Sequence, residues 1–193
     1  MFSELSDPAR QLFWGNLLLV GCCVFYLLWW AVAFKPTGAI KGMKSGWLLI
    51  PAFILGVAAV VSIIRGSSAV EAGHSFFSGG TVLLVAVIAY VVLLVVTRVA
   101  LHRQVTTELL LIVGWAALTC LEGDALYGMD ILTRNGAMVL FAAAILAAAV
   151  SMVCYVLYYG LTETAGYVDG MIPLLLVAIF MAVLAILIAR SAG

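Results

Sequence analysis

The stretch TVLLVAVIAYVVLLVVTRVA, residues 81–100, decides the class of fold. Within it only Thr81, Thr97 and Arg98 are not apolar. A helix of about 20 apolar residues is long enough to cross the hydrocarbon core of a bilayer, which is roughly 30 Å thick. Apolar and polar residues do not alternate here, as they would in a strand of an outer-membrane barrel. The stretch therefore predicts a membrane-spanning helix.

Further apolar runs lie on both sides of this stretch and predict the same kind of helix. Together they give six predicted spans, at residues 12–34, 47–64, 81–100, 106–126, 137–161 and 171–189. The fourth has a short strictly apolar part, 109–121, and reaches spanning length only with Glu108 and Glu122 near its ends. A re-entrant or interfacial segment is the alternative there. We expect a full span, because without it the basic linkers on either side would face opposite sides of the membrane.

The composition of the whole chain agrees with this class. Of 193 residues, 66% are hydrophobic and 9% are charged, against roughly 45–50% and about 25% in soluble domains. This excludes a soluble globular enzyme, a disordered chain and a secreted disulfide scaffold. Nine Lys and Arg balance nine Asp and Glu, which leaves no basic face for nucleic acid. We expect an all-α, polytopic membrane protein with the lipid bilayer as its partner: one domain, residues 1–193, with six transmembrane helices arranged as three hairpins.

The cysteines and histidines do not predict a metal site or a cofactor. Cys22, Cys23, Cys120 and Cys154 lie inside apolar runs without a CxxC pair, which is typical of buried small side chains. The two histidines, His74 and His102, fall in predicted linkers, whereas a membrane haem needs histidines within the helices.

Orientation follows from the basic residues of the short linkers. Lys35, Lys41 and Lys44 form the densest basic linker, and Arg98 and Arg103 fall on the same predicted side. We expect this side to be cytoplasmic and both termini to lie outside a bacterial-type inner (plasma) membrane.

Candidate helix starts are read from residue types that cap helices. Asp7 is predicted as the N-cap of the first helix, with Pro8 at the first helical position. Asn135 and Asp169 are predicted to cap the fifth and sixth helices in the same way.

Polar residues inside the spans are the candidates for function. On a helix of 3.6 residues per turn, Glu108, Trp115, Thr119 and Glu122 fall on one face of the fourth span. Lipid tails cannot solvate such a stripe, so we expect it to face the bundle interior or a wet cavity. The functional interpretation is a wall of a solute or ion path. The structural alternative is that the glutamates mark the interfaces and Thr119 donates to a carbonyl one turn earlier.

Other candidates lie beyond this stripe. Glu122, Asp124 and Asp130 form a predicted acidic mouth at the end of the fourth span. Ser151 and Tyr155 continue a face of small residues, Ala143 and Ala147, on the fifth helix. Asn16 in the first span is a buried amide that should bond to another helix or to a ligand.

These features favour a small membrane transporter or channel for a small solute or ion. Its path would be lined by Asn16, Glu108, Trp115, Thr119, Glu122, Ser151 and Tyr155. Catalytic motifs such as GxSxG, HExxH, Walker A and GxGxxG are absent from the sequence, so we predict no catalytic residues. The alternative is a non-catalytic membrane subunit that completes a larger complex. A third hypothesis is a lipid-modifying membrane enzyme that uses Glu122, Asp124 and Asp130. Homo-oligomers and partner membrane subunits both remain compatible with the small-residue faces.

Overall fold

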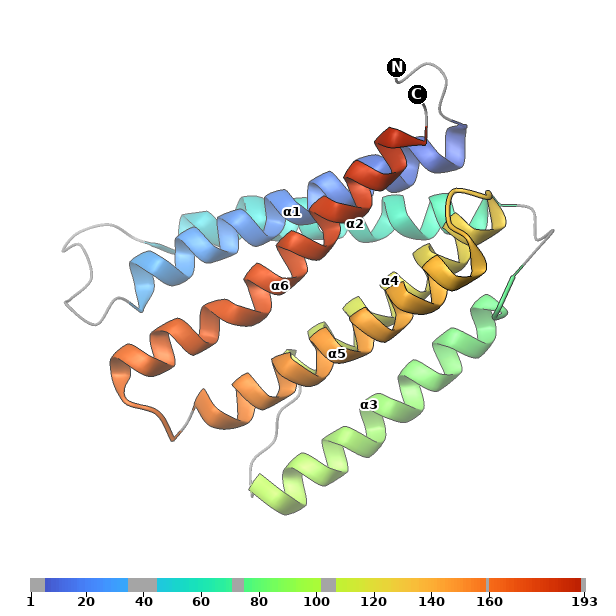
Figure 1. Ribbon diagram of the computed structural model, residues 1–193. Helices are drawn as coiled ribbons and strands as arrows, with labels where there is room; N and C mark the ends of the chain where they lie inside the picture. The colour runs from blue at the N-terminus through green and yellow to red at the C-terminus, as the bar shows by residue number, and fades with distance from the viewer. Residues whose placement is uncertain (1–5, 35–44, 71–74, 102–106, 159, 192–193) are drawn as a thin grey trace. The chain divides into compact units, whose positions relative to one another are not determined.

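The structure is a computed structural model that describes residues 6–34, 45–70, 75–101, 107–158 and 160–191. Every regular element among these residues is helical (Figure 1). In chain order the helices are α1 (Asp7–Ala33), the short 3₁₀ helix η1 (Ser45–Leu48), α2 (Leu49–Ser68), α3 (Gly79–Leu101), α4 (Thr107–Gly128), α5 (Arg134–Tyr158) and α6 (Glu163–Arg190). The predicted all-α class is confirmed.

Six of these helices are long and apolar enough to cross a membrane, so the six-span prediction is also confirmed. The short fourth run is part of one continuous helix, of which Leu109–Gly128 qualifies as a span. α6 begins at Glu163, well before the predicted start near residue 171. By the length and composition of its helices, the chain is a multi-pass membrane protein.

The helices belong to two compact units. The first lies within residues 1–69 and 153–193, and the second within residues 70–152. α5 is shared, because it passes from the second unit to the first after Met152. The single domain stays a prediction.

In the first unit, α1 packs against both α2 and α6 (Figure 1). Small residues let α1 and α2 come close, as is common between membrane helices. A Cβ on Gly15 would lie 2.6 Å from Cγ1 of Ile63, and a Cβ on Gly66 would lie 2.8 Å from Cδ2 of Leu12. The Ser62 hydroxyl also donates to the Gln11 carbonyl at 2.7 Å. The first two spans therefore pack against each other as predicted, and their glycines allow the two helix backbones to come close.

In the second unit, α3 packs against α4, which is the second predicted hairpin. α3 keeps apolar side chains exposed around its circumference, including Leu83, Leu84 and Val85. α4 and α5 meet at Gly123, where a Cβ would lie 2.7 Å from the Phe141 ring. The missing side chain of Gly123 is what allows this ring to reach α4.

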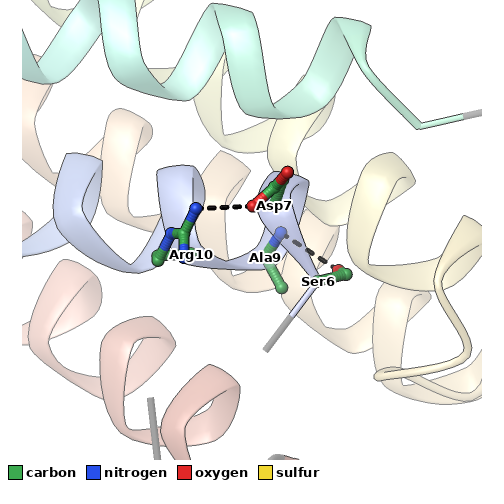
Figure 2. Close-up of polar contacts among 4 residues, drawn as sticks. All are labelled: Ser6, Asp7, Ala9 and Arg10. Carbon is green, nitrogen blue, oxygen red and sulfur yellow. Dashed lines mark hydrogen bonds and ion pairs between the residues drawn. The ribbon is translucent and has the colours of Figure 1, made fainter. Parts of the chain in front are cut away.

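The helix starts differ from the predicted caps. Ser6, not Asp7, caps α1: its hydroxyl accepts from the amide of Ala9 at 3.4 Å. Asp7 is the first helical residue and pairs with Arg10 at 2.5 Å on the exposed surface (Figure 2). Pro8 remains in the first turn, where its missing N–H is not needed for the helical ladder.

The other two predicted caps are also wrong. The Thr133 hydroxyl accepts from the amide of Gly136 at 3.1 Å, so Thr133 occupies the capping position of α5 and Asn135 lies within the helix. Thr162 precedes α6 as its N-cap. Asp169 lies inside α6 and is buried, so it is a span residue and not a helix start.

The face of α5 that is buried also differs from the predicted one. Ala143 is exposed, whereas the buried residues are Ala137, Ala144, Ser151 and Cys154. Their spacing of seven, seven and three residues is that of a helix stripe packed on neighbours. Ser151 is common to both faces.

Some residues used in the predictions lie outside the described part of the chain. These are the linker bases Lys35, Lys41, Lys44 and Arg103 and the histidines His74 and His102. The side chain of Glu108 is also outside it, although its backbone belongs to α4.

Candidate functional site

The predicted stripe on α4 lies on a buried face of this helix. Trp115 is 8% exposed, and Thr119 and Glu122 are 0% exposed. The Thr119 hydroxyl donates to the carbonyl of Trp115 at 3.0 Å, which is the bond to the preceding turn that the structural alternative predicted. Because its one proton is used in this bond, Thr119 offers acceptor lone pairs to any further partner.

Glu122 is a fully buried carboxyl side chain within a helix of spanning length. It lies six residues before the end of α4 at Gly128, which corresponds to about 9 Å along the helix axis. Ionisable residues inside membrane helices are costly by several kcal/mol at the bilayer centre, and they mostly face a bundle interior or a water-filled path. Burial of Glu122 therefore meets the first requirement of the predicted path.

Asp124 has a structural partner in the segment that leads into α3. Its Oδ1 accepts a hydrogen bond from the backbone amide of Phe76, with 2.6 Å between nitrogen and oxygen. The Phe76 ring lies 4.7 Å from Tyr127 and 5.7 Å from Phe141, centroid to centroid. Arg134 adds its guanidinium over the same ring at 6.0 Å. We name Phe76, Phe77, Tyr127 and Phe141 the aromatic cluster. A hydrogen bond to a carboxylate is stronger than one between neutral groups, so Asp124 anchors this cluster on α4.

Asp130 is exposed and ends α4. Its φ of 58° is in the left-handed region. The amide of Asp130 donates to the carbonyl of Tyr127 and the amide of Ile131 donates to that of Leu126, both at 3.0 Å. This bond pair is a Schellman motif with Asp130 at the position that glycine usually occupies. The three acids of the predicted mouth therefore have three different surroundings.

The remaining predicted residues are distributed over both units. Asn16 is buried in the first unit and its Nδ2 donates to the carbonyl of Leu12 at 2.9 Å. Ser151 is buried in the second unit and its hydroxyl donates to the carbonyl of Ala147 at 2.8 Å. Tyr155 is half-buried at the end of α5 that belongs to the first unit. The structure thus brings Trp115, Thr119 and Glu122 together on one helix face, and the joint path of all seven residues stays a prediction.

Sequence reasoning missed the buried carboxyl group of Asp169. Asp169 is 8% exposed within α6, and the Cys154 thiol of α5 lies close to it. A signal was available: Thr162 followed by Glu163 is an N-cap residue type followed by an acid in the first turn. This pattern predicts a helix that begins at Glu163, so that Asp169 lies inside the span.

Among the described residues, His, Cys, Asp and Glu side chains do not form a group of three that could hold a metal ion. Comparison with protein-family models, with curated proteins and with solved structures gives no match for this chain.

Proposed function

We propose that the chain is a small transporter or channel of the inner membrane that moves a small solute or ion, with the buried face of α4 as one wall of its path. The observation that carries this proposal is the complete burial of Glu122 in a helix of spanning length. A carboxyl group costs several kcal/mol in the middle of a membrane. Ionisable residues of this kind mostly face a bundle interior or a water-filled path and mark routes for ions or solutes.

Two hydroxyl side chains of the second unit suggest the class of solute. Thr119 and Ser151 both donate their hydroxyl protons to carbonyls of their own helices, so they are left with acceptor lone pairs. A buried carboxyl group and two acceptor hydroxyls in one unit suit a cation, or a solute with hydrogen-bond donors. Asn16, Glu108 and Tyr155 are further candidates for the path.

The test is flux through the purified protein in lipid vesicles. We expect it to dissipate imposed gradients of H⁺, Na⁺ or K⁺, followed with a pH-sensitive dye and with isotope uptake. Glu122→Gln should lower this flux about tenfold or more, because bonds to a charged group contribute about 1.5–3 kcal/mol and 1.4 kcal/mol is tenfold. The double variant with Glu108→Gln should lower it at least as much.

The matched control is Glu163→Gln, since Glu163 is exposed at the start of α6. It should transport like the original chain. All variants are first compared by size-exclusion chromatography, so that only folded protein is assayed. Normal flux through folded Glu122→Gln protein would show that the path does not run along α4.

The alternative of a non-catalytic membrane subunit is supported by α3, whose apolar side chains are exposed around the helix. A partner helix fits that surface as well as lipid does. Purification in mild detergent at native expression level, with mass spectrometry of co-purifying proteins, separates the two proposals. A stoichiometric partner would favour the subunit, and the chain alone or with copies of itself would favour the transporter.

A further inference from the structure

α6 contains a buried carboxyl group that the proposed path along α4 does not use. Asp169 is the seventh residue of this helix and is 8% exposed. Among the described residues, its Oδ2 has no hydrogen-bond partner, and no ion pair includes it. A buried carboxylate oxygen without a partner is costly, so this atom calls for a ligand.

Pro173 adds a second acceptor at the same residue. It lies inside α6, and proline has no N–H to donate to the carbonyl four residues earlier. That carbonyl belongs to Asp169, so it lacks its usual helical donor. In membrane transporters, carbonyls outside the helical ladder of an interrupted span bind cations.

The end of α5 brings a third oxygen to this part of the first unit. The Cys154 thiol lies close to Asp169. One turn further along α5, the carbonyl oxygen of Tyr158 lies 3.5 Å from the position of a Cβ on Gly166. Gly166 precedes Asp169 by three residues, so the two share a face of α6, and helical side chains lean toward the N-terminus, here toward Gly166. Tyr158 is the last residue of α5, where the helix dipole places partial negative charge.

We propose that the Asp169 carboxylate, the Asp169 carbonyl and the Tyr158 carbonyl bind a monovalent metal cation such as Na⁺. All three are oxygen acceptors, which are the ligands of hard cations. One carboxylate balances one positive charge, whereas Ca²⁺ takes about six to eight oxygens, with carboxylates prominent among them. Because two of the three oxygens belong to the backbone, a cluster of acidic side chains is not needed. This inference goes beyond the proposed function and does not rest on it.

The position of Asp169 along α6 keeps the site within reach of water. A helix of 28 residues is about 42 Å long, against a hydrocarbon core of about 30 Å. Asp169 lies about 9 Å from the start of this helix. It is therefore close to the level of one membrane interface, where water is available to complete the coordination of the cation.

The test is equilibrium binding of radioactive Na⁺ to the purified full chain in detergent, at constant pH and ionic strength. We expect saturable binding of one Na⁺ per chain. Asp169→Asn should weaken this binding about tenfold or more, because it removes the only charged ligand. Glu163→Gln removes the exposed acid at the start of α6. It is the matched control and should bind Na⁺ like the original chain.

Gly166→Ala tests the site with Asp169 in place. The new methyl group would lie 3.5 Å from the Tyr158 carbonyl oxygen, an ordinary contact that the fold accommodates, and alanine favours the helix. Because the methyl group fills space beside a proposed ligand, we expect the affinity for Na⁺ to fall about threefold or more.

Size-exclusion chromatography first establishes which variants are folded. Absence of saturable Na⁺ binding by the original chain would overturn the proposal, as would full affinity in Asp169→Asn. If Asp169→Asn does not fold, full affinity in Gly166→Ala would overturn it. Loss of binding in Glu122→Gln but not in the α6 variants would also overturn it, because the Na⁺ would then belong to the α4 path. Normal flux through Glu122→Gln protein that still binds Na⁺ would contradict the α4 path alone.

Discussion

At the scale of single residues, Asp130 shows how an acid that suggests a binding site can have a role in the backbone. Its φ of 58° and the paired amide bonds of Asp130 and Ile131 end α4. A left-handed residue costs roughly 1–2 kcal/mol for most side chains, and Asp and Asn tolerate it better because of their short polar groups. Asp130 is therefore suited to its position whether or not a cation ever binds there.

The conformation of Asp130 leads to a test of stability. Asp130→Gly should raise the free energy of unfolding by up to about 1 kcal/mol, because glycine adopts this φ without strain. Asp130→Val should lower it by about 1 kcal/mol or more, because a β-branched residue is disfavoured at positive φ. Thermal unfolding in detergent, followed by tryptophan fluorescence, measures both.

Asp130→Asn is the matched control and should leave the melting temperature unchanged, since Asn also tolerates the left-handed region. If Asp130→Val melts like the original chain, the turn is not held in this conformation in solution.

At the scale of helices, the packing of α1 on α2 depends on residues that lack side chains. Gly15 faces Ile63 closely enough that a Cβ would also lie 3.2 Å from the Ile63 backbone nitrogen. Backbone cannot move aside as a side-chain tip can. Between membrane helices, van der Waals packing of this kind replaces much of the hydrophobic driving force that holds soluble cores together.

A larger side chain at Gly15 should therefore separate the two helices. We expect Gly15→Val to lower the free energy of unfolding by about 1–3 kcal/mol, the usual cost of overpacking, and to lower the yield of monodisperse protein. Gly114→Ala is the control, because a Cβ on Gly114 meets nothing within 4 Å and alanine favours the helix. Equal melting temperatures for the original chain and Gly15→Val would contradict the close approach of α1 and α2.

At the scale of the whole molecule, six candidate spans predict that both termini lie on the same side of the membrane. The basic linker with Lys35, Lys41 and Lys44 predicts that this side is outside the cytoplasm. Alkaline phosphatase fused after residue 193 should be active in cells, and the same enzyme fused after Lys44 should be inactive. The reverse result would invert the orientation. Activity at both sites would contradict the five spans predicted between Lys44 and residue 193, because an odd number of spans places these two sites on opposite sides of the membrane.

The sequence by itself determined the six-span, all-helical class and the helix face of Trp115, Thr119 and Glu122. Both follow from local properties, since the length of an apolar run matches the bilayer and a helix repeats every 3.6 residues. Only the tertiary structure decided which polar residues are buried and what they contact. Asp7, Asn135 and Asp169 are all capping residue types near the start of a helical run. Of these three, only Asp169 is buried, close to the Cys154 thiol of α5. Asp124 could not be linked with Phe76 from the sequence either, because 48 positions separate them and no local pattern specifies a contact of that range.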